Sequence, residues 1–375
     1  MKITFIKSDV LECLEKVNSA VSTKNTNIPA LEGVLITAKD KTLTLTGFDL
    51  EIGIKAVIKD DIFVQEEGAV VIAAKLFADI LKKSNDERVT LQDEDTTVLI
   101  QSGRGKFKLP FIEAKDYPDV PSFDETDSVE IPAETLRSMI SQTIYAVSDD
   151  NKKPTYTGSL FKFVDSELTV VAVDGFRMAV RKEKLPESAN FEIIIPKKAQ
   201  TNLMKILGKF DSKKKDDVKV KIISGKKHVA FRVENYTIIT RHLEGTFLDY
   251  ESTIPKEYKT SAVVEVVKIK DSVERMSLLS QSDKVKSPVK CQFSGDKIDF
   301  TCSSTMGKAD DTLEVTVTGD ETEIGFNNKY LIDALKYVES DEVKLTLNGS
   351  LAPMIIGPKD GDSFLNMVVP MRLSN

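Results

Sequence analysis

Hydrophobic and polar residues follow a pattern that recurs along the chain. Three segments share one order: a short apolar strand, two small or polar residues, a lysine and an amphipathic helix. They align without gaps and lie at residues 70–83, 193–207 and 323–338. A strand with hydrophobic residues at every second position follows each segment, at residues 88–92, 218–222 and 343–347. One strand–helix–strand element is therefore predicted three times in the 375 residues.

A further helix is predicted at the start of each repeat. These helices are expected at residues 8–20, 132–147 and 268–279. Ser8 and Pro132 stand where an N-cap or first-turn residue belongs. Each repeat is therefore predicted to contain, in order, a helix, strands, a second helix and further strands.

The first two repeats also share the spacing of a proline, a glycine and an aspartate. Pro29 and Pro154 each stand four residues before a glycine, and Asp49 and Asp174 each follow that glycine by sixteen residues. A spacing kept over twenty residues indicates a common structure in the two repeats.

These repeats divide the chain into three domains of about 125 residues. Boundaries are expected in the segments at 117–129, rich in proline and aspartate, and at 248–255. We expect domains at residues 1–124, 125–252 and 253–375, with the third the most diverged.

Composition and cysteine content favour a cytoplasmic protein. Hydrophobic residues make up 41% and charged residues 30% of the chain, as in ordinary globular proteins. The start of the chain does not have the pattern of a secretory signal, and no run approaches the roughly 18 apolar residues of a membrane helix. Cys13, Cys291 and Cys302 are odd in number and far apart, so reduced thiols are expected.

The sequence lacks a recognisable catalytic or metal-binding motif. His228 and His242 have no ligand or base at a motif spacing, and the cysteines lack zinc-site spacing. Acidic residues at 93–96 and 148–150 suit Mg²⁺ chemically, but their turn-like surroundings favour solvated loops. A binding or scaffolding protein with no catalytic residue, metal or cofactor is expected.

Two alternatives stay open from the residues alone. One is a Mg²⁺-dependent DNA-modifying enzyme that uses Asp149 and Asp150. The other is a repeat protein that binds partner proteins but no DNA.

Charge is distributed unevenly between helices and the rest of the chain. The six predicted helices carry a net charge of +7, so the remainder of a chain with net charge −7 carries −14. The segment "PKKAQTNLMKILGK" (196–209) has no acidic residue. An acidic protein with basic helices suits local binding of a polyanion.

Several segments resemble the bacterial DNA polymerase III beta subunit, the sliding clamp family. They are "VAVDGFRMAV" (171–180), "IIIPKKA" (193–199) and the ending "VVPMRL" (368–373), and the likeness extends from "MKITF" at the start to the end of the chain. The resemblance implies an α+β fold with three clamp units per chain and helices on one face of antiparallel sheets. It also implies a head-to-tail homodimeric ring that encircles duplex DNA and gives the replicative polymerase processivity without catalysing a reaction.

The resemblance further implies a pocket for short peptides between the second and third units. The expected partners are the catalytic subunit of the replicative polymerase, the clamp loader, and repair and translesion proteins. The pocket residues carried over are Tyr156, Val173, Gly175, Arg177, Met178, Leu248, Leu351, Pro353, Met354, Met367, Val368, Val369, Pro370, Met371, Arg372 and Leu373. Phe176, Ser252 and Thr253 differ from some relatives, so a changed pocket rim is expected.

DNA contacts and the ring joint are likewise expectations. Basic residues expected to contact DNA are Lys24, Lys75, Lys82, Lys83, Arg137, Lys153, Lys197, Lys198, Lys205 and Lys329. The joint between subunits is expected to use Phe107 and Leu109 at one end of the chain and Leu278 and Leu279 at the other.

Overall fold

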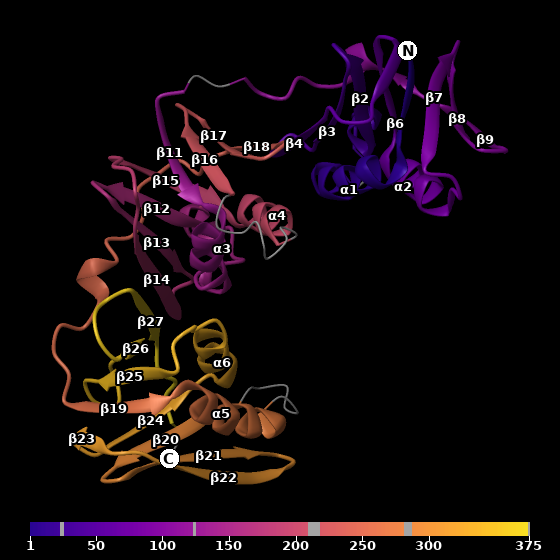
Figure 1. Ribbon diagram of the computed structural model, residues 1–375. Helices are drawn as coiled ribbons and strands as arrows, with labels where there is room; N and C mark the ends of the chain where they lie inside the picture. The colour runs from indigo at the N-terminus through magenta and orange to yellow at the C-terminus, as the bar shows by residue number, and fades with distance from the viewer. Residues whose placement is uncertain (23–25, 123–124, 209–217, 281–286, 374–375) are drawn as a thin grey trace. The chain divides into compact units, whose positions relative to one another are not determined.

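The computed structural model describes residues 1–22, 26–122, 125–208, 218–280 and 287–373 (Figure 1). Its helices and strands occur in the same order in each third of the chain. Each third contains two groups of four antiparallel strands. In each group, the strand at one end leads into a helix. The predicted threefold repeat is therefore confirmed.

The first repeat contains helices α1 and α2, which pack side by side (Figure 1). The helices are α1 (Lys7–Val17) and α2 (Ala74–Lys83). One sheet has the order β5-β1-β7-β8-β9 and the other β10-β6-β2-β3-β4. The strands are β1 (Lys2–Ile6), β2 (Gly33–Lys39), β3 (Thr42–Phe48), β4 (Ile52–Ile58), β5 (Phe63–Glu66), β6 (Gly68–Ala73), β7 (Arg88–Glu94), β8 (Thr97–Ser102), β9 (Gly105–Pro110) and β10 (Ile112–Glu113).

The second repeat contains helices α3 and α4. They are α3 (Ala133–Ser141) and α4 (Lys197–Leu207). One group of strands has the order β11-β16-β17-β18 and the other β15-β12-β13-β14. The strands are β11 (Asp127–Pro132), β12 (Gly158–Val164), β13 (Glu167–Val173), β14 (Arg177–Lys184), β15 (Phe191–Pro196), β16 (Lys219–Ser224), β17 (His228–Val233) and β18 (Tyr236–Arg241).

The third repeat contains helices α5 and α6, which again pack together (Figure 1). They are α5 (Val266–Ser280) and α6 (Asn328–Lys336). Its strand orders are β23-β19-β25-β26-β27 and β24-β20-β21-β22. The strands are β19 (Thr260–Glu265), β20 (Val289–Ser294), β21 (Lys297–Ser304), β22 (Gly307–Glu314), β23 (Val317–Gly319), β24 (Thr322–Phe326), β25 (Glu342–Leu347), β26 (Met354–Pro358) and β27 (Phe364–Val368).

The described residues form two compact units. One contains residues 1–136 and 198–242, and the other contains residues 137–197 and 243–375. In the first unit β4 pairs with β18, which joins strands of repeats one and two into a nine-stranded sheet. In the second unit β14 pairs with β27, which joins repeats two and three in the same way. Neighbouring repeats are therefore joined edge to edge by antiparallel strands.

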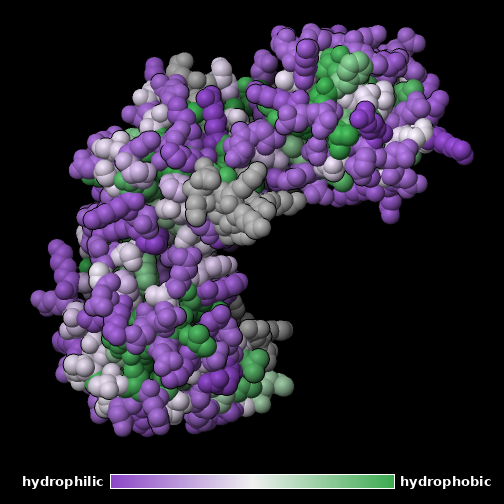
Figure 2. Space-filling view, viewed as in Figure 1, coloured by the Kyte–Doolittle hydropathy of each residue, from purple (hydrophilic) through white to green (hydrophobic). Residues whose placement is uncertain are grey.

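The second helix of each repeat has the buried face that its periodicity predicts. In α2 the buried residues include Phe77 and Leu81, and in α4 they include Leu203 and Leu207. A four-residue spacing places such pairs on one face of a helix. The exterior visible in Figure 2 is largely hydrophilic, and hydrophobic residues appear there only in small groups.

The spacing of proline and glycine marks the start of an equivalent strand in two repeats. Pro29 and Pro154 each open a short 3₁₀ helix, and a glycine then begins β2 or β12. A Cβ on Gly33 would lie 2.5 Å from Val71 Cγ1, and one on Gly158 would lie 2.5 Å from the carbonyl oxygen of Ile195. Glycine is required because the neighbouring strand passes this close.

Helix α1 begins at Lys7 after Ile6, so Ser8 lies in its first turn, one of the two places that the sequence predicted for it. One predicted helix boundary is wrong. Helix α3 ends at Ser141, six residues before the predicted end. Thr143 Oγ1 donates to the carbonyl oxygen of Met139 at 2.8 Å, and such a side-chain bond offers the backbone an alternative to the helix.

The remaining short 3₁₀ helices connect the larger elements. They lie at Asn18–Ala20, Ala114–Asp116, Ile144–Ala146 and Glu251–Thr253. All three cysteines are buried, and none of them forms a disulfide. Among the helices that the structure describes, none combines the length and hydrophobicity needed to cross a membrane.

Candidate docking surface and basic helices

The aspartates that share a spacing in the sequence build the same turn. Asp49 follows β3 and Asp174 follows β13. In each turn the aspartate Oδ1 accepts hydrogen bonds from the backbone N–H groups two and three residues later, at 2.9–3.1 Å. The other carboxylate oxygen, Oδ2, binds a cation: Lys198 Nζ in the first turn and Arg177 Nε in the second. Each turn thus holds a fixed carboxylate at a joint between repeats.

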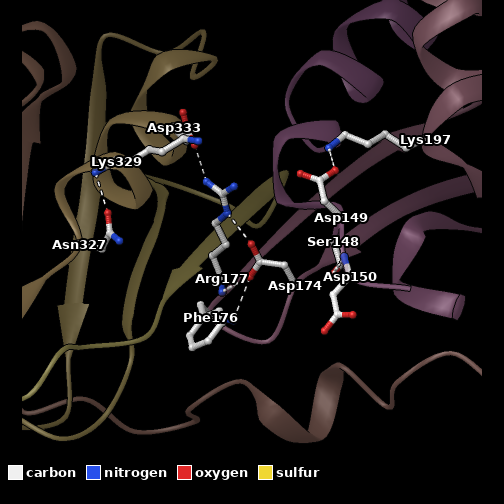
Figure 3. Close-up of polar contacts among 10 residues, drawn as sticks. All are labelled: Ser148, Asp149, Asp150, Asp174, Phe176, Arg177, Lys197, Asn327, Lys329 and Asp333. Carbon is white, nitrogen blue, oxygen red and sulfur yellow. Dashed lines mark hydrogen bonds and ion pairs between the residues drawn. The ribbon is translucent and has the colours of Figure 1, made fainter. Parts of the chain in front are cut away.

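Arg177 is the centre of a polar network at the joint of repeats two and three (Figure 3). Its Nε donates to Asp174 Oδ2 at 2.9 Å, and its Nη1 donates to Asp333 Oδ2 of α6 at 2.5 Å. Its guanidinium lies 4.6 Å from the ring centroid of Tyr330 and 5.4 Å from that of Tyr145. Burial lowers the pKa of Arg177, but hydrogen bonds to Asp333 and Asp174 outweigh burial and raise it.

Arg177, predicted to line the pocket, is almost completely buried. Only 9% of Arg177 is exposed, and both of its ionic partners lie inside the joint. The residue before it, Phe176, is 59% exposed, and its ring stacks on Tyr330 at 6.2 Å. Phe176 also accepts a backbone hydrogen bond from Val369. Arg177 therefore positions the turn that carries Phe176.

Replacing Arg177 with methionine should destabilise the second unit by about 3–5 kcal/mol, because two partly buried carboxylates would lose their shared cation. Urea unfolding followed by circular dichroism would measure the change. Arg275→Met is the matched control, because the Arg275 side chain is 55% exposed in its ion pair with Asp311 and should cost less than about 1 kcal/mol. Equal losses in the two variants would contradict the role given to Arg177.

One half of the predicted pocket is an apolar cluster on the β14–β27 strand pair. Met178 and Met367 are opposite each other on these strands. Both belong to a cluster with Val173, against which Tyr156 and Leu248 pack. Tyr156 and Leu248 are half-buried, so part of this cluster reaches the surface.

The other half lines a cavity of about 990 Å³ in the second unit. Its walls include the chain end and a loop after β25. The predicted pocket residues among them are Leu351, Val369, Pro370, Met371, Arg372 and Leu373. Leu351 is 84% exposed, which is the largest exposed fraction among the large hydrophobic residues that the structure describes.

The chain end folds back onto β24. Met371 donates its backbone N–H to the carbonyl oxygen of Gly325 at 2.8 Å, and the two residues form a β-bridge. A Cβ on Gly325 would lie 2.6 Å from Leu373 Cδ2. Pro370 lacks an N–H and follows the end of β27, so the chain leaves that strand before it reaches β24.

Two residues predicted in the pocket lie in the core instead. Met354 and Val368 are paired across β26 and β27, and both belong to the core of the third repeat. Side chains of a strand alternate between its faces, so Val368 points away from the face that carries Met367. The remaining residues predicted in the pocket are Gly175, which is exposed, and Pro353, which is half-buried.

Residues predicted to contact DNA are mostly exposed. Exposed positions are Lys75, Lys82, Lys83, Lys153, Lys198, Lys205 and Lys329. Arg137 and Lys197 are half-buried, and Lys24 lies outside the described residues.

Carboxylates accompany several of these lysines. Lys197 Nζ binds Asp149 Oδ1 at 2.7 Å (Figure 3), and Lys198 Nζ binds Asp49 at 2.5 Å and Glu51 at 3.0 Å. Burial lowers the pKa of Lys198, but hydrogen bonds to Asp49 and Glu51 outweigh burial and raise it. Lys198 is thus held as a cation.

The acidic residues considered for Mg²⁺ do not form a cluster. Asp149 binds Lys197, and Asp150 accepts a hydrogen bond from the backbone of Lys152. In the described part of the chain, no three His, Cys, Asp or Glu side chains are placed to share a metal ion.

Residues predicted at the ring joint lie on an edge strand, β9, and on a helix, α5. Phe107 is 40% exposed and Leu109 half-buried on β9, the last strand of its sheet. Leu278 is 76% exposed on α5, which packs on β21 and on the edge strand β22. Leu279 is half-buried against the core of the third repeat.

Comparison with known protein families shows which family the chain belongs to. Residues 1–121, 130–249 and 251–372 match the N-terminal, central and C-terminal domains of the DNA polymerase III beta subunit. The chain belongs to this family. As a member of the sliding clamp family, it is a non-catalytic processivity factor of the replicative DNA polymerase.

Relatives of this clamp chain match it along almost its whole length. The beta sliding clamp of Bacillus subtilis strain 168 is 31% identical over 385 residues, which cover 99% of this chain and 100% of the relative. A beta sliding clamp of Staphylococcus epidermidis is 32% identical over 382 residues, covering 99% of each chain.

Solved structures of clamps have the same fold. The crystal structure of the Bacillus subtilis sliding clamp is 30% identical with a TM-score of 0.94, and the match covers both chains completely. The sliding clamp of Pseudomonas aeruginosa, solved bound to griselimycin, is 25% identical with a TM-score of 0.91, and that match also covers both chains completely.

Proposed function

We propose that two copies of this chain close head to tail into a ring around duplex DNA. Domains at residues 1–124, 125–252 and 253–375 supply the six units of the ring. The observation that carries this proposal is the pattern of strand edges. Strands β4, β14 and β22 occupy equivalent places in the three repeats, and so do β9, β18 and β27. Each internal joint pairs one strand of the first set with one of the second.

This pattern leaves one strand of each set without its equivalent partner. In the described sheets, β22 pairs with β21 and β9 pairs with β8. A second copy satisfies both edges when β22 of one chain pairs with β9 of the other. Charge supports this pairing, because β9 contains two lysines and no acidic residue, whereas β22 contains three acidic residues and one lysine.

The register of the internal joints predicts which residues meet in the ring. In β4–β18, Ile54 is opposite Ile238. The equivalent residues are Ala309 on β22 and Phe107 on β9. Phe107 would then lie beside the partner's α5, where the partner's Leu278 is exposed. In the proposed ring, Phe107 and Leu278 would therefore meet through repetition of a strand pairing already present in the chain.

DNA binding is proposed for basic residues of the helices and for two further lysines, Lys24 and Lys153. The proposed contacts are Lys75, Lys82, Lys83, Arg137, Lys153, Lys197, Lys198, Lys205 and Lys329, together with Lys24. Contacts to phosphate give no sequence preference and permit sliding. Confinement by the ring, with weak phosphate contacts, would keep the clamp on DNA.

The surface around Phe176 is proposed as the docking site for short peptides. These would come from the polymerase catalytic subunit, the clamp loader, and repair and translesion proteins, all acting in the cytoplasm. The apolar cluster on β14–β27 and the cavity at the chain end would form its two halves. The griselimycin complex of a homologue supports a ligand site on clamps of this family.

Changing Lys197 and Lys198 to glutamate should weaken retention on DNA. For each phosphate that the variant no longer neutralises, the slope of log affinity against log salt should fall by roughly 0.9. Retention on nicked plasmid at increasing salt would measure both effects. Lys226→Glu with Lys227→Glu, a neighbouring lysine pair in the β16–β17 turn, is the control for charge alone. A salt slope equal to that of the parent would remove Lys197 and Lys198 from the DNA surface.

A further inference from the structure

The joint of repeats one and two is fastened by a turn and a helix start. The turn after β3 carries Asp49 and Glu51, and both carboxylates bind Lys198, the second residue of α4. Asp49 is only 11% exposed, and its Oδ1 is fixed by two backbone N–H groups. The turn of one repeat thus holds the second helix of the next repeat by an ionic contact.

The joint of repeats two and three uses the same two places. The turn after β13 carries Asp174 and Phe176, and these contact α6, the second helix of repeat three. One contact runs from Asp174 through Arg177 to Asp333 (Figure 3). The other is the Phe176 ring, which stacks on Tyr330. At both joints, the contacts with the helix are therefore made by an aspartate at the start of the turn and by a larger residue two positions later.

The strand registers locate the same turn in repeat three. Phe48 is opposite Gly53, Val173 is opposite Met178, and Ser303 is opposite Lys308. The residues that directly follow Phe48, Val173 and Ser303 are therefore equivalent. They are Asp49 and Asp174 in the first two repeats and Ser304 in the third. Ser304 Oγ accepts the backbone N–H of Met306, which repeats the local bond of the aspartates.

The helix that would receive this turn is α2 of a second copy. In the strands that lead into α2 and α4, Ala73 is opposite Gly33 and Pro196 is opposite Gly158. Ala73 and Pro196 are therefore equivalent, and so are Lys75 and Lys198, two residues later. The next residue, Leu76, is equivalent to Tyr330, the ring on which Phe176 stacks. Met306, equivalent to Phe176, is 72% exposed, and Leu76 is 46% exposed.

We propose that the ring joint repeats this turn-to-helix contact but without its carboxylate. Met306 of one chain packs against Leu76 of the partner subunit, while Ser304 offers Lys75 of the partner subunit no charge. The turn-to-helix contacts inside the chain are ionic at both joints, and the equivalent contact between chains is not. This contact is therefore expected to hold the subunits less tightly than its equivalents hold neighbouring repeats of one chain. This inference rests on the proposed head-to-tail dimer.

Ser304→Asp tests the missing carboxylate. An ionic contact of the Asp49–Lys198 kind should slow subunit exchange and lower the dimer dissociation constant, each by about 2–5-fold at low salt. Lys75→Ala in the same chain should cancel the gain. Ser294→Asp adds the same charge at the far end of the β20–β21 hairpin and should change neither quantity. Exchange between fluorescently labelled dimers would give the rates.

Met306→Ser and Leu76→Ser test the apolar contact. Each variant should raise the dissociation constant about tenfold, and the double variant should add little, because both remove one contact. Val164→Ser, at a 47% exposed valine that ends β12, should leave dimerisation unchanged. Unchanged exchange in both Ser304→Asp and Met306→Ser, with a dimeric parent, would overturn the inference and leave the ring standing. A monomeric parent would instead remove the proposed dimer itself.

Discussion

The Leu278→Asp variant is expected to be a folded monomer with the chain mass of 41.6 kDa. Leu278 is 76% exposed in the single chain, so an aspartate there costs the fold little. In the proposed ring the same side chain is buried beside Phe107 of the partner subunit. An unpaired carboxylate at that place would cost several kcal/mol of association. Sedimentation equilibrium would give the mass directly.

The structure refines the choice of residue for this experiment. Leu279 packs against the core of the third repeat, so its replacement would confuse unfolding with dissociation. Val267→Asp is the matched control, because Val267 is 68% exposed at the other end of α5. The control should sediment as the parent dimer. A dimer mass for Leu278→Asp would place the joint elsewhere.

Removal of residues 371–375 is expected to abolish binding of a clamp-binding peptide. Binding of the parent near micromolar corresponds to about −8 kcal/mol. Met371 bridges to Gly325 and Leu373 packs against it, so truncation would remove one wall of the cavity and expose the edge of β24. Fluorescence polarisation of a labelled peptide with a glutamine followed by a leucine–phenylalanine pair would measure binding.

A chain that ends at Leu373 is the matched control for this truncation. It keeps both contacts of the chain end with Gly325 and should bind the peptide as tightly as the parent does. Circular dichroism should show that both shortened chains fold. Equal peptide binding by all three chains would mean that residues 371–375 only cover β24, and that the peptide binds elsewhere.

The threefold architecture could be predicted because short-range sequence patterns determine its elements. The spacing of proline, glycine and aspartate marks a 3₁₀ helix, a strand start and a turn, each within a few residues. The amphipathic helices after a lysine are also local, and α2, α4 and α6 begin within two residues of that lysine. Helix ends were less predictable: α3 stops at Ser141, two residues before Thr143, whose side chain bonds to the backbone of the helix.

The polar network at Arg177 could not be predicted from spacing. Arg177 and Asp333 are 156 positions apart, and only the β14–β27 strand pairing brings them together. The burial of Val368 is a different case, since alternation along a strand separates it from Met367. The family resemblance assigned both Met367 and Val368 to the pocket. Successive side chains of a strand, however, lie on opposite faces of the sheet.

The pairs of lysine with carboxylate were also missed at the sequence level. Counting charge on helices identified a basic surface around Lys197 and Lys198. It did not reveal that Asp149, Asp49 and Glu51 lie against these lysines. Such pairs involve residues more than 40 positions apart, so no local pattern contains them.

The most direct test of the ring is to cut the DNA that it encircles. The clamp would be loaded onto nicked circular plasmid by the clamp loader of the same cell with ATP, and separated from free protein by gel filtration. A topological link predicts that the clamp elutes with the circle and is released when a restriction enzyme linearises it. A clamp that stays bound to linear DNA as tightly as to the circle would contradict the encircling ring.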